Sequence, residues 1–311
     1  MRNSKIRFGI MADIHQDFMY KAEERLATFI ARMNDENVDF IIQLGDFCFP
    51  FPNNKSFLSI WEQFNGPRYH VLGNHDMDRS TKKGMMDFLG IEKNYYSFDC
   101  GNYHFIVLDP NYLSIDGQDI DYEHGNYFNY PDSINNLPDE QLEWLKADLA
   151  NTNNHTIIFS HQSLESPYNK SLSVGIHHHE KFQTILHEAN RAAGVRKVVA
   201  CMNGHNHVDG VKVIDDIYFI QINSMSYLYL GERYRTVRYS EEITNNHHKV
   251  LAQSAPYEEL LYAIVTMEPG KLTIEGRESE YVGPSPSECG HGNTVAGHVA
   301  LPKISNRNLL F

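Results

Sequence analysis

Short apolar runs, rich in β-branched and aromatic residues, recur along the chain. Each has the length of a β-strand and ends in a polar or glycine-containing stretch, which is typical of buried strands. The predicted strands are Ile6–Met11, Phe40–Leu44, Tyr69–Leu72, His104–Leu108, Thr156–Ser160, Val198–Met202 and Ile217–Ile222. Two further runs, Leu260–Met267 and Lys271–Glu275, are joined by Glu-Pro-Gly and predict a hairpin.

Apolar residues at helical spacing predict helices between these strands. The predicted helices are Lys21–Asn34, a helix between Asn135 and Asn151, and Thr184–Ala193. In the second of these, Pro138 lies near the first helical position, where proline is favoured. Because strands alternate with helices, we expect an α/β fold with a central sheet and helices outside it.

Two regions depart from this alternation. Residues 110–137 contain many Tyr, Asn, Asp and Gly residues without a clear period, so we expect an insertion loop, either a lid or a binding loop. Residues 283–311 begin with Gly-Pro-Ser-Pro-Ser and also lack a strong period, which indicates a C-terminal tail. The predicted organisation is one domain over residues 1–282, including the insertion loop and a terminal hairpin at about 260–276, followed by the tail.

The composition is that of an ordinary globular protein, with 41% hydrophobic and 22% charged residues in a chain of 311. No stretch approaches the roughly 20 continuous apolar residues of a membrane span, so we expect no membrane association. The formal net charge of -13 repels polyanions, so we expect no nucleic-acid polymer as a partner. A small phosphorylated substrate remains compatible with this charge, because a bound metal can outweigh the global field locally.

The cysteines and the N-terminus bear on the cellular compartment. Cys48, Cys100, Cys201 and Cys289 are far apart in the sequence, which argues against a disulfide framework and a zinc–thiolate site. The N-terminus carries positive charge but no uninterrupted apolar region and no small-residue cleavage site, so we expect a cytoplasmic protein. A secreted protein whose signal peptide had been trimmed would show the same sequence.

Residue types that bind metals follow five of the predicted strands. In chain order they are Asp13 and His15, then Asp46, then Asn74, His75 and Asp76, then His161, and finally His205 and His207. In open α/β sheets ligands bind at the carboxyl ends of the strands, so we expect these side chains to converge. Mixed carboxylate, imidazole and amide ligands suit Mn, Fe, Zn or Co rather than copper or calcium. The sequence therefore predicts a site for two divalent cations and leaves their identity open.

The spacing within these groups limits how they can bind. Asp13 and His15 are two residues apart, which places both side chains on one side of an extended segment and lets one cation take both. His205 and His207 have the same spacing, but their imidazoles can also diverge to two cations if the loop turns. The Asp46 carboxylate has two oxygens and can bridge cations about 3.5–4 Å apart.

The order Asp-x-His, Gly-Asp, Gly-Asn-His-Asp, His and Gly-His-x-His resembles that of the calcineurin-like metallophosphoesterases, from about residue 6 to about residue 224. The resemblance implies a four-layer α-β-β-α sandwich of the metallo-dependent phosphatase type with a two-metal site. It also implies hydrolysis of a phosphoester by in-line attack of a metal-bridging hydroxide. The expected substrate is a small phosphodiester or diphosphate.

The same resemblance implies a role for each candidate residue. One metal would be bound by Asp13, His15 and His207, the other by Asn74, His161 and His205, and Asp46 would bridge them. His75 would neutralise or protonate the leaving group, and Asp76 would orient the imidazole of His75.

Some positions bear on the branch of the family. Many members carry GDxxD or GDxxY, whereas this chain has Gly-Asp-Phe-Cys-Phe at 45–49. The missing Tyr, and His15 where purple acid phosphatases have Gly, argue against that tyrosinate–iron subgroup. The LTIEGR stretch at 272–277 is similar to the manganese-dependent ADP-ribose/CDP-alcohol diphosphatase branch, which has Gln at the place of His15. The Asp-x-His form is closer to the cyclic-nucleotide and glycerophosphodiester phosphodiesterases, and both branches stay open.

Other polar and aromatic residues have simpler interpretations. Asp46 could cap a turn, and Asn74 could be a left-handed turn residue. Among histidines outside the motifs, the tract His177–His179 indicates a solvated loop, and the expected surface positions are His247, His248, His291 and His298. His70 and His104 are expected in the core or at a sheet edge. The tyrosines of residues 110–137, which are Tyr112, Tyr122, Tyr127 and Tyr130, could stack on a base but are expected to pack the loop onto the body.

Three other functions compete with a small-molecule diesterase: a phosphomonoesterase, an inactivated binding protein with the phosphoesterase fold, and a metal-dependent nuclease. All seven predicted ligand positions are filled, which favours an enzyme. A nuclease that acts on polymers should show a basic groove, whereas the chain has 27 basic and 40 acidic residues. The sequence does not indicate the oligomeric state.

Overall fold

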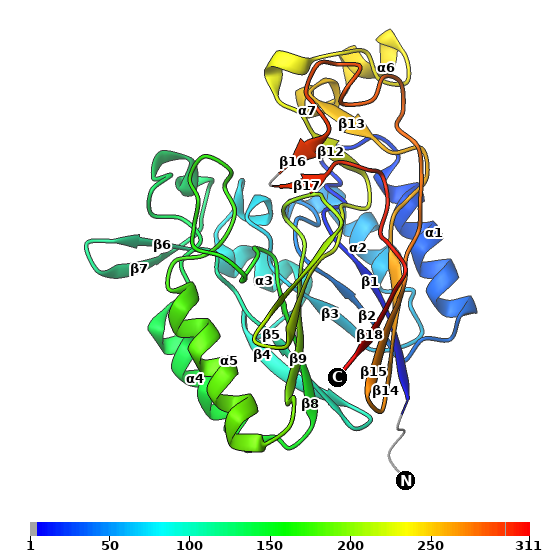
Figure 1. The fold of residues 1–311 in the computed structure, drawn as a ribbon. Helices are drawn as coiled ribbons and strands as arrows, with labels where there is room; N and C mark the ends of the chain where they lie inside the picture. The colour runs from blue at the N-terminus through cyan, green and yellow to red at the C-terminus, as the bar shows by residue number, and fades with distance from the viewer. Residues whose placement is uncertain (1–4, 296) are drawn as a thin grey trace.

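Two six-stranded sheets lie face to face in the computed structural model, which describes residues 5–295 and 297–311 (Figure 1). The first sheet has the order β18-β15-β14-β1-β2-β3 and the second β10-β11-β9-β8-β5-β4. The strands of the first sheet are β1 (Ile6–Met11), β2 (Phe40–Gln43), β3 (Arg68–His70), β14 (Ala263–Glu268), β15 (Lys271–Glu275) and β18 (Arg307–Leu310). Those of the second sheet are β4 (Tyr96–Cys100), β5 (Tyr103–Val107), β8 (His155–Ser160), β9 (Val198–Asn203), β10 (Gly210–Ile214) and β11 (Ile217–Gln221).

Each sheet contains a block of parallel strands, with antiparallel strands on one side of it in the first sheet and on both sides in the second. The pairs β1–β2 and β2–β3 are parallel in the first sheet, and β5–β8, β8–β9 and β9–β11 are parallel in the second. The other pairs are antiparallel, including the hairpin β14–β15. The parallel blocks bring the carboxyl ends of strands that are far apart in the sequence to a common edge.

The inner faces of the two sheets share one aromatic core. Phe8 of β1 stacks on Phe40 of β2 with ring centroids 4.7 Å apart, and its edge meets Phe105 and Phe159 of the second sheet at 5.7 Å and 5.9 Å. All four rings are fully buried or nearly so. Side chains alternate along each strand, so burying these residues inward directs the intervening ones, such as Ile41, to the outer face.

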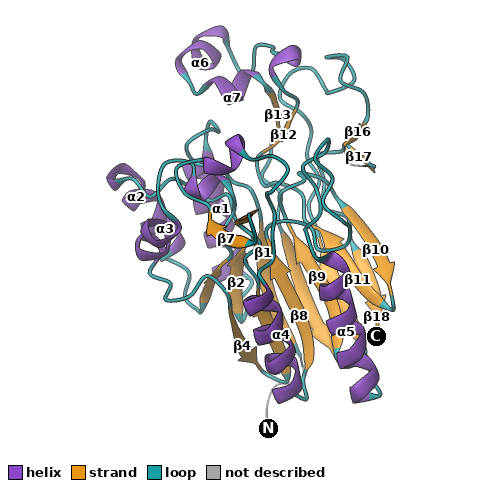
Figure 2. Ribbon diagram, turned by 90° about the vertical axis from the view of Figure 1, so that its left-hand side faces the viewer, coloured by secondary structure: helices purple, strands orange, loops and turns teal. Residues whose placement is uncertain are grey.

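Helices cover both outer faces (Figure 1), and Figure 2 views the molecule from the side of the helices that cover the second sheet. The first sheet is covered by α1 (Ala22–Asp35), α2 (Lys55–Trp61) and α3 (Lys82–Leu89), and the second by α4 (Asp139–Asn151) and α5 (His179–Ala193). Leu26 and Phe29 of α1 share a core with Ile41, and Leu145 of α4 shares another with Ile158. The four-layer α-β-β-α sandwich implied by the resemblance is therefore confirmed.

The predicted strands and helices agree with the structure to within a few residues, with one larger difference. The third strand, predicted to end at Leu72, ends at His70. Helix α5 begins at His179, five residues before the predicted start. Of the His177–His179 tract, which was expected in a solvated loop, only His179 lies in the helix, whereas His177 forms an isolated bridge with Asn136 and His178 precedes the helix. The predicted insertion loop holds a hairpin of β6 (Tyr112–Ile115) and β7 (Gln118–Asp121), followed by the short helix η3 (Asn126–Asn129).

Chain excursions cover the end of the sandwich where the functional motifs lie. Residues 227–257, called the cap segment below, contain β12 (Tyr227–Tyr229), η4 (Glu232–Tyr234), α6 (Glu241–Asn246), α7 (Lys249–Ala252) and β13 (Ser254–Pro256) and project at the top of Figure 1. The predicted tail contains β16 (Thr294–Val295) and β17 (His298–Val299), and its last residues add β18 to the first sheet. Across the described residues, none of the helices has the length and apolarity that crossing a membrane requires.

Candidate metal centre

The loops after β1, β2, β8 and β9 bring six of the predicted ligands into two compact groups. The first group is Asp13, His15 and His207, and the second is Asp46, His161 and His205. Within each group, one potential ligand atom from every residue lies within 4.8 Å of the others. This is the division into two sites that the resemblance implied, and it shows that His205 and His207 diverge because their loop turns.

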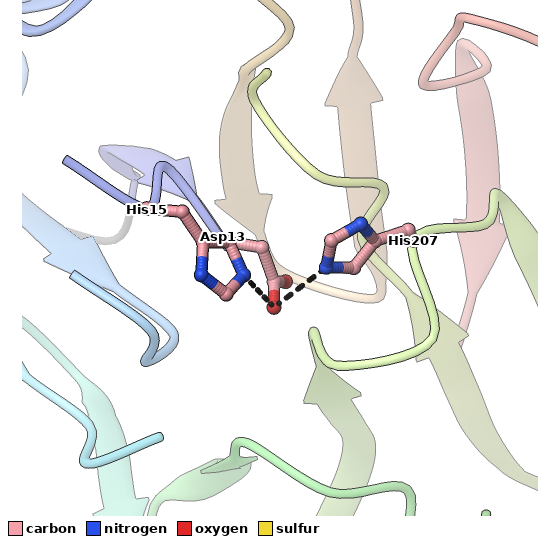
Figure 3. Close-up of side chains that lie close together, drawn as sticks. All are labelled: Asp13, His15 and His207. Carbon is pink, nitrogen blue, oxygen red and sulfur yellow. Dashed lines mark ion pairs between the residues drawn. The ribbon is translucent and has the colours of Figure 1, made fainter. Parts of the chain in front are cut away.

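The first group surrounds the carboxylate of Asp13 (Figure 3). Its Oδ1 lies 3.2 Å from Nε2 of His207 and 3.8 Å from Nε2 of His15. Asp13 Oδ1 and His15 Nε2 are buried but have no hydrogen-bond partner among the residues that the structure describes. An unpaired buried polar atom is costly, so two of them that face one point indicate a position that a cation would fill.

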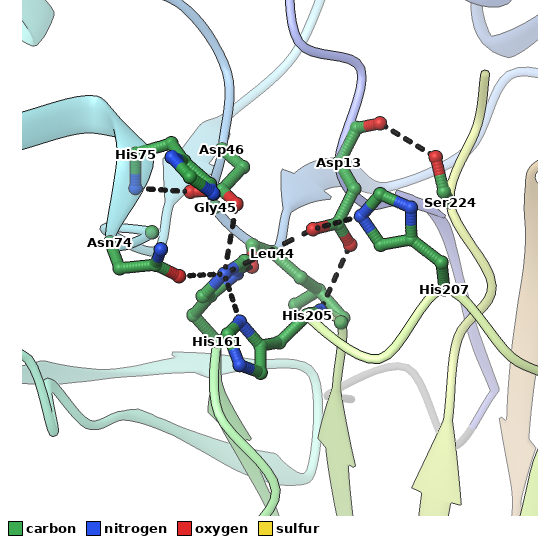
Figure 4. A network of polar contacts seen from close by, with 12 residues as sticks. Asp13, Leu44, Gly45, Asp46, Asn74, His75, His161, His205, His207 and Ser224 are labelled. Atoms are coloured by element: carbon green, nitrogen blue, oxygen red, sulfur yellow. Dashed lines mark hydrogen bonds and ion pairs between the residues drawn. The ribbon is translucent and has the colours of Figure 1, made fainter. Parts of the chain in front are cut away.

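The second group surrounds the imidazole of His161 (Figure 4). Its Nε2 lies 3.2 Å from Oδ2 of Asp46, 3.2 Å from Nδ1 of His205 and 3.1 Å from Oδ1 of Asn74. Asn74 thus joins this group, as predicted from its position in the Gly-Asn-His-Asp motif. A carboxylate, two imidazoles and an amide oxygen all converge on one point.

Asp46 lies between the two groups. Its Oδ2 is 3.2 Å from Nε2 of His161 and 3.4 Å from Nε2 of His15, which belong to different groups. Its Oδ1 accepts a hydrogen bond of 2.8 Å from the backbone N–H of His75. The Asp46 carboxylate is thus fixed in the position that a bridging ligand needs.

Five of the seven predicted ligands have a left-handed backbone. The φ angles are 53° for Asp13, 51° for His15, 54° for Asp46, 66° for His205 and 51° for His207. The expectation that Asp13 and His15 share an extended segment is therefore wrong, and the two side chains converge because both backbones are left-handed. Such conformations are uncommon for residues other than glycine, and they concentrate at functional sites.

Two motif glycines allow the loops after β2 and β3 to meet. Gly45 has a φ of 97°, and a Cβ atom there would lie 2.5 Å from Nδ1 of His161. A Cβ atom on Gly73 would lie 2.1 Å from the backbone nitrogen of Asp46. Any larger residue at either position would displace a predicted ligand.

Backbone carbonyls fix three of the imidazole rings. Nδ1 of His161 is 2.7 Å from the carbonyl oxygen of Leu44, and Nδ1 of His207 is 2.9 Å from that of Tyr227. Nε2 of His205 is 2.9 Å from the carbonyl oxygen of Ser173. Because each ring donates one N–H outward, the lone pair of its other nitrogen faces the centre, as metal ligation requires.

The electrostatics of the centre favour positive charge. Burial lowers the pKa of His15 to about 3 and that of His205 to about 4, which keeps these rings neutral and able to ligate. Burial also opposes charge on His161, but the carboxylates of Asp46 and Asp13 overcome it and raise the pKa of His161 to about 9. Burial raises the pKa of Asp46, but the neighbouring histidines outweigh it and hold that pKa well below its usual range.

The carboxylate beside the imidazole of His75 belongs to Asp78 and not to Asp76. Nδ1 of His75 lies 2.8 Å from Oδ2 of Asp78. The prediction that Asp76 orients this imidazole is wrong, because the chain forms the short helix η2 (His75–Met77) here. In such a turn residues three apart lie on the same side, whereas neighbours point in different directions.

Asp76 instead holds the loops of the centre together. Its carboxylate accepts backbone hydrogen bonds from Gly73 at 2.8 Å, Phe47 at 2.7 Å and Asp46 at 3.2 Å. Burial and the charge of Asp46 raise the pKa of Asp76 to about 8, against the effect of the donating N–H groups of Gly73 and Phe47. Asp76 therefore supports the backbone that carries Asp46.

Tyr127 of the insertion loop reaches the centre, which the sequence did not reveal. Its hydroxyl lies 3.2 Å from Nδ1 of His75 and donates a hydrogen bond to Oδ1 of Asp78. It also accepts a hydrogen bond of 3.2 Å from Nδ2 of Asn74. That bond fixes the amide so that its oxygen points to His161. Tyr127 thus packs the loop onto the body, as predicted, and also orients a predicted ligand.

A cavity of about 730 Å³ opens over the two groups. One wall comes from the cap segment together with Phe18 and Phe49, and the other from the insertion loop and residues 172–174. His248 lies in the first wall and stacks on Phe18 at 4.7 Å. The expectation that His248 is an ordinary surface residue is therefore wrong, because the fold brings the cap segment over motifs that lie far away in the sequence.

The family model of the calcineurin-like phosphoesterases matches residues 6–209, which is more than half of the chain. The chain therefore belongs to the calcineurin-like phosphoesterase family. Its motifs lie in the matched region, at the ends of the strands described above.

Known proteins resemble this chain in sequence and fold. The manganese-dependent ADP-ribose/CDP-alcohol diphosphatase of Arabidopsis thaliana is 26% identical over 215 residues, or 56% of this chain and 66% of that protein. The chain thus spans about two thirds of the length of the curated relatives it matches. A dimetal phosphatase from Danio rerio has a TM-score of 0.60 at 15% identity and covers 90% of this chain and 99% of its own.

A protein with a different described role shares the same fold. GAP50, the anchor in the inner membrane complex of Plasmodium, has a TM-score of 0.56 at 15% identity and covers 99% of this chain and 90% of its own. Likenesses at this identity establish the fold and not the activity, which depends on the chemistry of the site.

Proposed function

We propose that the protein is a two-metal hydrolase of small phosphodiesters or diphosphates. The observation that supports this most strongly is the convergence of two ligand groups on the carboxylate of Asp46, at the floor of a cavity. The unpaired atoms of Asp13 and His15, and the positive charge that the centre favours, fit two cations.

In this proposal the seven predicted ligands divide between two cations, in the two groups that the structure forms. One cation would be held by Asp13, His15 and His207, the other by Asn74, His161 and His205, and Asp46 would bridge them. Two such ions supply charge that neutralises a phosphoryl group, activate water and align the attacking and leaving oxygens. The ligand set suits Mn, Fe or Zn, and the name of the Arabidopsis relative favours Mn.

His75 would act on the leaving group. Its Nδ1 is bound by Asp78 and contacted by Tyr127, which leaves Nε2 for the substrate. The carboxylate of Asp78 stabilises the protonated ring, and the ring lines the cavity beside Asp46. From this position His75 can neutralise or protonate the oxygen that departs from phosphorus.

The cavity supports a substrate with organic groups on both sides of phosphorus. Its volume of about 730 Å³ is in the range of drug-sized ligands, far more than a phosphate needs, and Phe18, Phe49, Phe128 and Leu172 line it. A diester or a diphosphate would use both walls, whereas a simple monoester would use one. The diphosphatase name of the relative points the same way. We expect no nucleic-acid polymer and no membrane as a partner, a cytoplasmic location, and a domain boundary near residue 282.

The test is hydrolysis of bis-p-nitrophenyl phosphate and of p-nitrophenyl phosphate after reconstitution with Mn, Fe, Zn or Co. We expect chelator-sensitive turnover that is faster on the diester. Asp46→Ala and His161→Ala should abolish it while the fold is retained, and Asp87→Ala, which changes an exposed carboxylate on α3, should not. Full activity of Asp46→Ala, or turnover that survives chelation, would reject the proposal. Faster turnover of the monoester would favour a phosphomonoesterase.

A further inference from the structure

Two exposed cations line the cavity without an internal counter-ion. They are Arg79 and Lys249, and neither makes an ion pair or a side-chain hydrogen bond with any of the residues that the structure describes. Some other surface lysines do pair with nearby carboxylates, as Lys83 does with Asp87 at 2.7 Å and Lys181 with Asp139 at 2.8 Å. In a chain of net charge -13, unpaired cations in a cavity indicate an anionic ligand.

Arg79 and Lys249 connect to the metal centre through short chains of contacts. Arg79 directly follows Asp78, the residue that holds His75. Lys249 directly follows His248, whose ring stacks on Phe18 at 4.7 Å, and Phe18 in turn stacks on His15 at 5.4 Å. The backbone of Arg79 is therefore beside the residue that binds His75, and that of Lys249 is at the outer end of a stack of rings that begins at His15, while both residues line the cavity.

Both cations act on His248, which lines the same cavity. Burial lowers the pKa of His248, and the charges of Lys249, His247 and Arg79 lower it further. The carboxylates that line the same cavity are already committed, because Asp46 faces the two ligand groups and Asp78 binds His75 and Tyr127. The positive charge of Arg79 and Lys249 is therefore available to a ligand.

We propose that Arg79 and Lys249 bind the phosphate that is not attacked, so that the site selects diphosphates over phosphodiesters with a single phosphate. This inference rests on the proposed function. Hydrolysis of a diphosphate adds water across a P–O–P bond and releases two phosphate monoesters, so the leaving group is itself a phosphate. Arg and Lys stabilise such a group through charge-assisted hydrogen bonds, and the backbone of Arg79 is beside Asp78, which binds His75.

The experiment compares two substrates that differ in the second phosphate. These are ADP-ribose, which has two phosphates, and the p-nitrophenyl ester of thymidine 5′-monophosphate, which has one. For Arg79→Ala and Lys249→Ala we expect kcat/KM on ADP-ribose to fall about 5- to 10-fold each, as loss of a charge-assisted contact at an exposed position implies, with little change on the other substrate. Lys249→Arg should keep most of the activity on ADP-ribose. The preference of the wild type for ADP-ribose over the substrate with one phosphate should decrease at high salt.

Matched controls are Arg32→Ala and Lys55→Ala, which remove exposed cations of α1 and α2 outside the cavity and should change neither substrate. Equal losses on both substrates, or none on either, would overturn the inference while leaving the proposed function intact. If the wild type hydrolyses neither substrate, the proposed function fails, and calorimetry with methylene diphosphonate then tests the two cations alone. Weaker binding to the double variant Arg79→Ala/Lys249→Ala than to the control variants would support the inference, and unchanged binding would reject it.

Discussion

The imidazole of His75 is held by the carboxylate of Asp78, with 2.8 Å between Nδ1 and Oδ2, while the adjacent Asp76 binds backbone N–H groups. Two neighbouring carboxylates thus serve different purposes. Asp78 acts on the residue that would meet the leaving group, and Asp76 acts on the backbone that carries Asp46.

Because the two carboxylates have different partners, replacing Asp78 or Asp76 by Asn should affect different properties of the enzyme. Asp78→Asn should leave metal affinity unchanged and lower kcat, more for alkyl than for p-nitrophenyl leaving groups. His75→Ala should show the same pattern with a loss of roughly 10²–10⁴-fold, the usual range for a general acid. Asp76→Asn should instead weaken metal binding, because it disturbs the loop of Asp46. Kinetics with a series of leaving groups, together with metal titration, separate these outcomes, and equal losses on all leaving groups in His75→Ala would exclude the acid role.

Gln221 of β11 should control metal affinity without touching the metals. Its Oε1 accepts a hydrogen bond of 2.8 Å from Nδ2 of Asn206, the residue between His205 and His207, and its Nε2 donates to Glu165 at 3.1 Å. Gln221→Leu should therefore loosen the left-handed loop and lower metal affinity about 10- to 100-fold, as loss of groups that orient ligands does.

A second buried glutamine provides the control for this titration. Gln141 of α4 binds the backbone of Asp109 through both of its amide atoms, at 2.7 Å and 3.0 Å. Gln141→Leu should reduce stability but leave metal affinity unchanged. If both variants lowered metal affinity equally, the loss in Gln221→Leu would result from reduced stability of the fold and not from a change in the loop of His205 and His207.

The prediction from sequence succeeded where chemistry and periodicity agree. The Gly-Asn-His-Asp and Gly-His-x-His motifs follow the apolar runs that form β3 and β9, so strand prediction alone placed Asn74, His205 and His207 at the carboxyl ends of strands in the two sheets. Helix α1, with Leu26 and Phe29 on one face, was recognised for the same reason.

Prediction from the sequence failed where contacts between distant parts of the chain decide the structure. Strand β18 lies in a segment without a strong period and is held by pairing with β15. His248 becomes part of the cavity wall only when the cap segment folds over Phe18, more than 200 residues earlier in the chain. The i, i+3 spacing of His75 and Asp78 was a signal in the sequence that could have identified the partner of His75.

Phe128 is expected to bind the organic part of the substrate. It lines the cavity with 64% of its surface exposed and lies 4.3 Å from Tyr127, centroid to centroid. Phe128→Ala should raise KM for ADP-ribose about 3- to 10-fold through lost stacking, with kcat little changed. Tyr130, two residues away and 48% exposed, does not line the cavity, so Tyr130→Ala is the matched control. An equal rise in KM for both variants would argue against a direct contact.

His104 should make stability depend on pH. It lies 2.8 Å from carboxylates of both Asp99 and Asp148, and these outweigh burial and raise its pKa in the folded state. Because the pKa of His104 is higher in the folded state than in the unfolded state, protonation of its ring stabilises the fold. This stabilisation is fully present below the unfolded pKa of about 6.5 and is lost as the pH rises through the folded pKa. His104→Gln should therefore cost about 1–2 kcal/mol at pH 5.5 and less at pH 9.

Urea unfolding of His104→Gln at the two pH values measures this difference. Asn190→Ala is a suitable control, because the neutral Asn190 side chain binds the backbone of Val198 and its loss should cost the same at both pH values. A cost for His104→Gln that is the same at pH 5.5 and pH 9 would show that the two ion pairs do not contribute.

The most direct test of the two-metal centre is anomalous diffraction from crystals of the protein loaded with Mn²⁺. We expect two peaks about 3.5–4 Å apart, one beside Asp13 and His207 and the other beside His161 and His205, with the carboxylate of Asp46 between them. Asp46→Ala crystals should lose at least one peak. A single peak in the wild type, or peaks bound away from these residues, would contradict the two-metal proposal.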